Sequence, residues 1–254
     1  MRRYLIGLAV GWACIGNVQA QTAPSIDWSG LYAGGAVGAT RSQADTAMSV
    51  AKADGYFTST DPAQIAGAGD GTLKQWRPSG SLYGGYGRQY GHVVLGVEAD
   101  AGTLLFDDDR ATTVGYTSSP GNSFTIRQSV KADWLATVRP RLGWAEGNWL
   151  AYVTGGLAVA RLSVDTSYTD TSFSGSSRSS QDKTQLGWSI GAGGEYALGD
   201  NWSLRGEYLF TDLGRITSTS PVSETFGGNP VLAHSAELQS HAIRIGLTYR
   251  FQGL

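Results

Sequence analysis

The stretch HAIRIGLTYRF, residues 241–251, separates two kinds of side chain with a period of two. Its odd positions from Ile243 to Phe251 are apolar or aromatic, and its even positions include Arg244, Gly246 and Arg250. Such alternation predicts a β-strand whose two faces meet different surroundings. The first question is therefore which face meets an apolar environment, and what that environment is.

Seven further stretches share this strand-like character. Each is long enough to cross a bilayer as a tilted strand, which takes roughly 9 to 11 residues. The full set of predicted strands is 28–40, 80–90, 92–105, 131–145, 149–163, 184–198, 202–213 and 239–251.

The predicted connections between these strands alternate between two lengths. The short ones are Gly91 alone, residues 146–148 and residues 199–201, all with hairpin residues. The long ones are polar and lie at about 41–79, 106–130, 164–183 and 214–238. This arrangement predicts an all-β fold, an eight-stranded antiparallel up-and-down transmembrane β-barrel, formed by residues 21–254 as one domain.

The N-terminal segment 1–20 is typical of a secretory signal peptide, with a basic start, a short apolar run and small residues before Ala20. Its removal would take away Cys14, the one cysteine, so no disulfide framework or cysteine metal site is expected. The full chain has a formal net charge of -2 and lacks a basic cluster, which argues against nucleic acid as a partner.

A soluble ligand-binding barrel would also alternate, with its apolar face inward. Two patterns favour a membrane barrel with the apolar face outward. The first is a set of aromatic residues beside the short turns, where a membrane interface favours them. We expect the following residues to form this aromatic ring: Trp28, Tyr90, Trp144, Trp149, Tyr196, Trp202, Tyr249 and Phe251.

The second pattern is a glycine-rich face that carries nearly balanced charges in mid-strand. An arginine on the lipid face at mid-depth would cost roughly 2 to 4 kcal/mol, so these charges should point inward and pair. We expect a structural charge network inside the barrel, formed by Glu98, Asp100, Arg139, Arg141, Glu195, Arg205, Glu207 and Arg244.

Several motifs resemble one family of small outer-membrane β-barrel proteins from alphaproteobacteria. They are WSGLYAGGAVGAT, VLGVEAD, WLATVRPRLGWAEGNWLAYVTGGLA, GWSIGAGGEYAL, WSLRGEYLFTDLG and IRIGLTYRF. The family is described as porin-family or OmpA-like and includes surface antigens and hemin-binding proteins. The resemblance covers all the predicted strands but none of the long loops.

The resemblance implies a barrel in the outer membrane of a Gram-negative bacterium, with short turns in the periplasm and long loops outside the cell. It also implies contact with outer-membrane lipid and lipopolysaccharide, and insertion by the barrel-assembly machinery. That machinery reads a terminal aromatic residue, but here Phe251 is followed by a tail at 252–254, so the signal is displaced.

Candidate chemistry is sparse in this sequence. Its histidines, His92, His234 and His241, stand beside no catalytic or metal motif, so we expect neither enzymatic activity nor a metal site. DDDR at 107–110 indicates a solvated loop start, with cation binding as the alternative, and GAGG at 191–194 lies within a predicted strand.

The leading hypothesis is a structural outer-membrane barrel whose loops form an antigen or a ligand-binding surface. The alternatives are a small-solute channel and a hemin-binding surface protein. For heme, the conceivable loop contacts are Tyr56, Trp76 and His234. The loop ligand is not identified by any motif.

Overall fold

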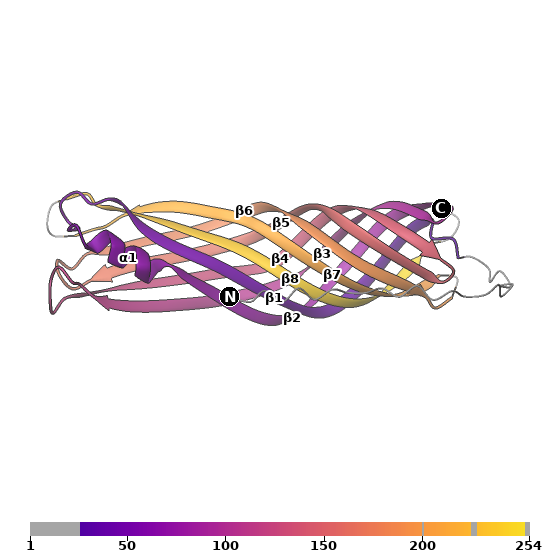
Figure 1. Ribbon diagram of the computed structural model, residues 1–254, viewed down its shortest axis with the longest axis horizontal. Coiled ribbons are helices and arrows are strands. Elements are labelled where there is room, and N and C mark those ends of the chain that lie inside the picture. The colour runs from indigo at the N-terminus through magenta and orange to yellow at the C-terminus, as the bar shows by residue number, and fades with distance from the viewer. Residues whose placement is uncertain (1–25, 200, 225–227, 252–254) are drawn as a thin grey trace, which may run out of the picture.

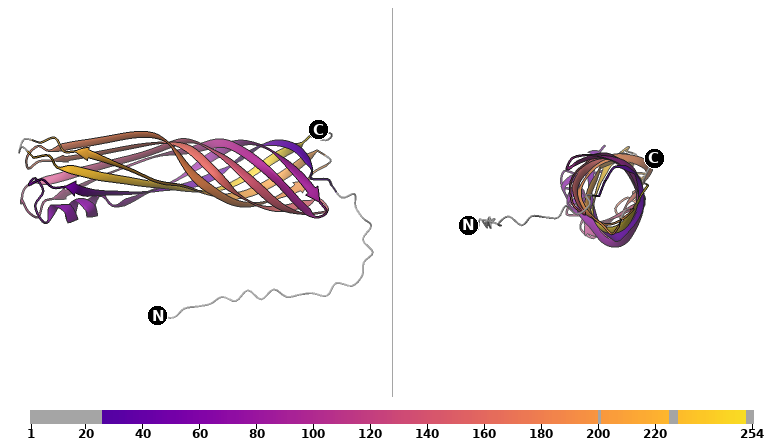
Figure 2. Two further views of the ribbon diagram at one scale, coloured as in Figure 1. Left: turned by 90° about the horizontal axis from the view of Figure 1, so that it is seen from above. Right: turned by 90° about the vertical axis from the view of Figure 1, so that its right-hand side faces the viewer.

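The computed structural model describes residues 26–199, 201–224 and 228–251, in which eight antiparallel strands close into a ring (Figures 1 and 2). Each strand pairs with its neighbours in the chain, and the last pairs with the first. The predicted eight-stranded up-and-down barrel is confirmed. The elements are β1 (Gly30–Lys52), α1 (Asp61–Gly69), β2 (Gly71–Tyr90), β3 (Val93–Gly115), β4 (Ser123–Glu146), β5 (Trp149–Asp170), β6 (Ser176–Ala197), β7 (Trp202–Pro221) and β8 (Val231–Arg250).

The two ends of the barrel differ. At one end, which we call the turn end, Gly91 (φ +61°) and Gly147 (φ +57°) make the tight reversals that favour glycine. The opposite loop end carries α1 and the longer connections, at the left of Figure 1. In the described residues, no helix is long and apolar enough to span a bilayer. The expected signal peptide 1–20 and the tail 252–254 lie outside the described residues.

The expected long loops are mostly strand, which corrects the predicted boundaries. Of the segment 41–79, only residues 53–60 and 70 lie outside regular elements, while β1 runs to Lys52 and α1 and β2 occupy most of the rest. In the described residues, the segments 106–130, 164–183 and 214–238 are likewise mostly strand. DDDR at 107–110 therefore lies within β3 rather than at the start of a loop.

These segments look like loops in the sequence because their outward residues are polar. Their inward residues are apolar, as Ala44, Phe106 and Leu162 show, and they pack together inside the barrel. Bulges shift the alternation in β4 between Ala132 and Leu135, and in β7 between Asp212 and Arg215. A fixed two-residue period therefore misses the inward positions beyond each bulge.

Backbone pairing is interrupted at two seams in the loop-end half. The pairing of β2 with β3 stops at Ser81 and Gly102, and that of β6 with β7 stops at Trp188 and Asp212, apart from one isolated bridge. Beyond these points β7-β8-β1-β2 form one sheet and β3-β4-β5-β6 form the other. The loop-end half is therefore two four-stranded sheets packed face to face over a shared core.

Side chains bridge the seams where backbone pairing stops. The Gln75 amide donates to the carbonyl of Asp107 at 3.0 Å and accepts from its N–H at 3.1 Å, so it replaces one residue of strand pairing between β2 and β3. At the other seam the hydroxyls of Ser177 and Ser220 lie 2.6 Å apart. The seams are thus held by side chains rather than by a continuous backbone ladder.

The interior is layered along the barrel axis. A charged layer fills the turn-end half. An apolar layer follows it, formed by Ala44, Leu73, Leu104, Phe106, Val130, Ala132, Leu135, Ala158, Ala160, Leu162, Leu213, Ile216, Ala236 and Leu238. A second, aromatic-rich layer closes the loop end beneath α1, where Ile65 is fully buried.

We expect Phe106→Ala to lower the free energy of unfolding by about 3–5 kcal/mol, because it leaves a cavity between the two sheets. Urea unfolding of the refolded barrel in detergent micelles measures this change. The matched control, Asp109→Ala on the outward face of β3, should change stability by less than about 0.5 kcal/mol. Equal effects of the two substitutions would show that this segment does not form the packed core.

Candidate functional site

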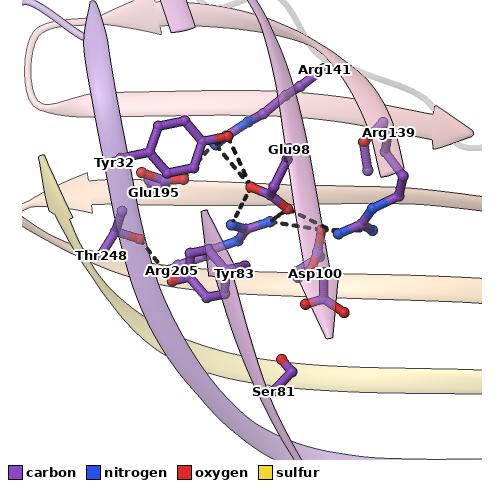
Figure 3. Close-up of polar contacts among 12 residues, drawn as sticks. Tyr32, Ser81, Tyr83, Glu98, Asp100, Arg139, Arg141, Glu195, Arg205 and Thr248 are labelled. Atoms are coloured by element: carbon purple, nitrogen blue, oxygen red, sulfur yellow. Dashed lines mark hydrogen bonds and ion pairs between the residues drawn. The ribbon is translucent and has the colours of Figure 1, made fainter. Parts of the chain in front are cut away.

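Glu98 on β3 is the centre of the charged layer (Figure 3). Its carboxylate oxygens accept hydrogen bonds from Arg205 at 2.6 and 2.8 Å and from Arg139 at 2.9 Å. The hydroxyl of Tyr32 donates to the same carboxylate at 3.0 Å. Because all four side chains are buried, these charge-assisted bonds replace the water that each ion has lost.

Glu207 and Asp100 extend the network toward the loop end. One oxygen of Glu207 accepts from Arg205 at 2.9 Å and from Arg139 at 3.3 Å, and the other accepts from Arg244 at 2.6 Å. Arg244 also pairs with Asp100 at 2.8 Å. Residues from four strands, β3, β4, β7 and β8, are thus joined through the interior.

Glu195 forms the part of the network nearest the turn end. It accepts from Arg141 at 2.6 Å and from the hydroxyl of Ser203 at 3.0 Å, and Arg250 lies 3.7 Å away. Arg250 donates to the backbone carbonyl of Trp28 and covers its ring at 5.0 Å. Arg250 faces the predicted polar side, but the sequence reasoning did not include it in the network.

Buried tyrosines also belong to this layer, and the sequence reasoning missed them. The guanidinium of Arg141 lies 3.6 Å from the ring centre of Tyr152, and that of Arg205 lies 4.3 Å from that of Tyr83. A Cβ at Gly193 would lie 2.5 Å from the hydroxyl of Tyr152, so glycine makes room for the ring. The sequence pattern that could have revealed these tyrosines is a tyrosine at an inward position opposite a glycine on the next strand. The glycines of GAGG at 191–194 accordingly lie within β6.

All the charged residues predicted for the interior lie there, and each is buried. Their carboxylates and guanidinium groups bind one another, so the site is a structural cross-link between strands. This set comprises Glu98, Asp100, Arg139, Arg141, Glu195, Arg205, Glu207 and Arg244.

The expected aromatic ring lies outside the barrel near the turn end, with one exception. Trp28 is 1% exposed and packs inside against Val94 and Leu150, so its assignment to the outer ring is wrong. It precedes β1 and turns inward, where Arg250 binds its carbonyl. The remaining members face outward or lie at the rim: Tyr90, Trp144, Trp149, Tyr196, Trp202, Tyr249 and Phe251.

A second set of aromatic residues lies higher on the outer surface, at the level where the seams begin. Trp188 and Phe210 are in contact there, with ring centres 5.3 Å apart, and Trp134 and Trp76 are exposed. Between these two levels the outward residues are mainly apolar, and above the second level they are mainly polar. Two aromatic levels around one apolar band are typical of a transmembrane barrel.

The residues considered for heme do not share one site. Trp76 faces outward and is 62% exposed, whereas Tyr56 and His234 are buried at the loop end. Tyr56 donates to Asp170, and His234 is bonded to the hydroxyl of Ser220 at 2.8 Å. The pKa of Tyr56 is raised, mainly by burial and secondly by the hydrogen bond to Asp170. Its phenol is therefore protonated at neutral pH.

The other two histidines make local contacts. His92 stacks on Trp144 with ring centres 5.1 Å apart. On the outer surface, Nδ1 of His241 is hydrogen-bonded to the Tyr208 hydroxyl at 2.7 Å. Across the described ranges, no group of three or more His, Cys, Asp or Glu residues is arranged to hold a metal ion.

Comparisons with known proteins agree with this geometry. Residues 10–251 match the model of the outer membrane protein beta-barrel domain. The 31 kDa outer-membrane immunogenic protein of Brucella melitensis is 33% identical over 77% of this chain and 74% of its own length. The 22 kDa outer membrane protein of Rhizobium leguminosarum is 31% identical over 52% of this chain and 51% of its own length.

Among solved structures, the outer membrane protein OprG from Pseudomonas aeruginosa has a TM-score of 0.44 and 14% identity, with coverage of 90% of this chain and 99% of that chain. The relatives named above are outer-membrane proteins. This chain is accordingly placed in the outer membrane of a Gram-negative bacterium. The family match covers nearly the whole chain. The chain belongs to the outer membrane protein beta-barrel domain family.

Proposed function

We propose that this chain is a structural outer-membrane barrel that displays its loop end as an antigen or ligand-binding surface, and that it catalyses no reaction. The observation that carries this proposal is the layered interior. A network of paired charges is followed by a layer of packed apolar side chains contributed by both sheets. Together the two layers fill the interior, so any ligand or antibody would bind the outer surface of the barrel.

The display surface is larger than the loops alone. Beyond the second aromatic level the strands continue with polar outward residues such as Asp109, Arg127 and Ser180, all exposed. In the proposed orientation this half stands outside the cell and the short turns lie in the periplasm. The name of the Brucella melitensis relative, an immunogenic protein, supports display to an immune system.

The proposed route to the membrane is insertion by the barrel-assembly machinery. Phe251 is 40% exposed on the outer surface, and its backbone N–H donates to the carbonyl of Leu31 at 2.8 Å. An exposed aromatic side chain beside the closing strand pair is available to such machinery. The band between the aromatic levels is apolar, so it would contact the acyl chains of outer-membrane lipid and of lipopolysaccharide. Contact with both belongs to the same proposal.

The small-solute channel and the hemin-binding alternative lack a supporting observation. A channel would need an open path through the apolar layer, where Phe106 and Leu162 are packed with 1% and 2% exposure. Heme would need its candidate contacts in one place, but Trp76 and Tyr56 lie on opposite sides of the barrel wall.

We expect Arg139→Glu to destabilise the barrel without opening it. The substitution removes one of the cationic partners of Glu98 and of Glu207 and buries a third carboxylate beside them, which should lower the free energy of unfolding by at least about 3–5 kcal/mol. In planar bilayers, neither the wild type nor this variant should give stepwise conductance. The exposed control Arg161→Glu should unfold like the wild type. Steady conductance of the wild type would contradict the closed interior.

We expect Thr117→Cys at the loop end to react with a membrane-impermeant maleimide on intact cells, because Thr117 is exposed outside the apolar band. The matched control is Glu146→Cys beside a short turn, which should react only after the outer membrane is opened. Cys14, the one natural cysteine, lies in the expected signal peptide. The opposite labelling pattern would reverse the proposed orientation.

A further inference from the structure

The seam between β6 and β7 is closed at the loop end by serine residues alone. They join Ser176 to Ser223, Ser177 to Ser220 and Ser179 to Ser218. The first pair exchanges two backbone hydrogen bonds of 2.9 and 2.7 Å, and the hydroxyls of the other two pairs lie 2.6 and 3.0 Å apart. We call these six residues the serine clasp. Because continuous strand pairing resumes only at Trp188, the clasp holds the two sheets together at this end.

His234 on β8 supports the clasp from the neighbouring strand. Its Nε2 lies 2.8 Å from the hydroxyl of Ser220, which is bonded in turn to Ser177, so one chain of hydrogen bonds spans β8, β7 and β6. The His234 ring is 6% exposed, and its Nδ1 is buried without a hydrogen-bond partner in the part of the chain that the structure describes. The tautomer that leaves no N–H unpaired has Nε2 donating to Ser220 and Nδ1 unprotonated.

No acidic group is placed to pair with a protonated His234 ring. The residues beside it on β1 and β7 are Met48 and Ser218, and the Ser220 hydroxyl is the hydrogen-bond partner of its side chain among the described residues. Charged or titratable groups lie around the loop-end interior on the other elements, but none is bonded to His234. They are Tyr56, Asp61, Arg110, Tyr116, Tyr168, Asp170, Lys183 and Glu224.

Burial lowers the pKa of His234 to about 4, from the ordinary value of 6.5. A second proton would place an N–H on Nδ1 without an acceptor, and a charge without a counter-ion, in the aromatic-rich layer. A state with the seam open exposes the ring and returns its pKa toward 6.5. The open state therefore binds more protons between pH 6.5 and about pH 4, so the closed clasp is fully stable above this window and loses stability as the pH falls through it.

A hollow of about 600 Å³ on the outer side of β1, β8 and β7 lies next to this strand position. His234 and Ser218 contribute to its wall, and Asp70 and Arg215 also line it without bonding to His234. An imidazolium that leaves the core would therefore meet water and a carboxylate within a short distance.

We propose that the hydrogen-bond chain from His234 through Ser220 to Ser177 is an acid-sensitive clasp, in which protonation of His234 releases Ser220 and separates β6 from β7 at the loop end. Opening exposes the aromatic-rich layer, which includes Tyr168 and Leu232, at one side of the barrel. The seam between β2 and β3 lacks this device, because it is bridged by the amide of Gln75, which does not titrate. The proposal does not depend on which ligand the loop end binds.

Hydrogen exchange at Ser176 and Ser223 tests the proposal, because their backbone N–H groups form the bridge across the seam. Refolded full-length barrel in detergent micelles is exchanged at about pH 7.5 and about pH 5, and each rate is divided by the intrinsic rate at that pH. We expect the corrected rate to be roughly tenfold to thirtyfold higher at the lower pH. His234→Gln keeps an amide that can donate to Ser220 but does not titrate, so its two corrected rates should agree within about twofold.

The ratio of the two rates is the readout, so a variant that merely loosens the seam at both pH values is not mistaken for a loss of the acid response. His92→Gln and His241→Gln are the matched controls and should keep the wild-type ratio, because both residues make only local contacts elsewhere. An unchanged rate in the wild type, or a wild-type ratio in His234→Gln, would overturn the proposal and the latter would assign the response to a carboxylate such as Asp170. If His234→Gln does not fold, as judged by the boiling-dependent gel shift, an NMR titration of the wild-type imidazole decides. A His234 ring that titrates near its ordinary value of 6.5 would then contradict the clasp.

Discussion

Backbone N–H and C=O groups have no water to bind within a bilayer, and the rest of this structure follows from that constraint. Pairing is complete around the ring only in the turn-end half, where the outer surface is apolar. The ladder between β2 and β3 runs from Tyr90 to Ser81, close to the roughly 9 to 11 residues that a tilted strand needs to cross. Beyond that level water reaches the strand edges, and the ring divides into two sheets.

At the same boundary, the polarity of the inward and outward faces of the strands is reversed. In the lipid-embedded half, charges such as Glu98 and Arg205 are buried inside and leucines and tryptophans face outward. In the loop-end half, Phe106 and Leu162 are inside and charges face outward. One half thus follows the rules of a membrane barrel and the other follows those of a soluble sandwich, although the same strands run through both.

The sequence was sufficient for the strand count, the antiparallel order, the turn end and the inward direction of Arg139 and Arg244, because a strict two-residue period and glycine turns mark these features locally. The length of the strands was not predictable in this way, since Ser- and Thr-rich outward positions resemble loops. Gly214 and the bulge after Asp212 also interrupt the period. Trp28 was misassigned because its inward turn depends on Arg250, which is distant in the sequence.

The division of the loop-end half into core and surface has an evolutionary consequence. Outward residues there, such as Asp109 and Arg178, are exposed, and substitutions at such sites usually change stability by no more than about 0.5 kcal/mol. Inward residues such as Phe124 are fixed by packing. The outward residues of the strands themselves, not only those of the connections between them, can therefore vary while the barrel remains folded.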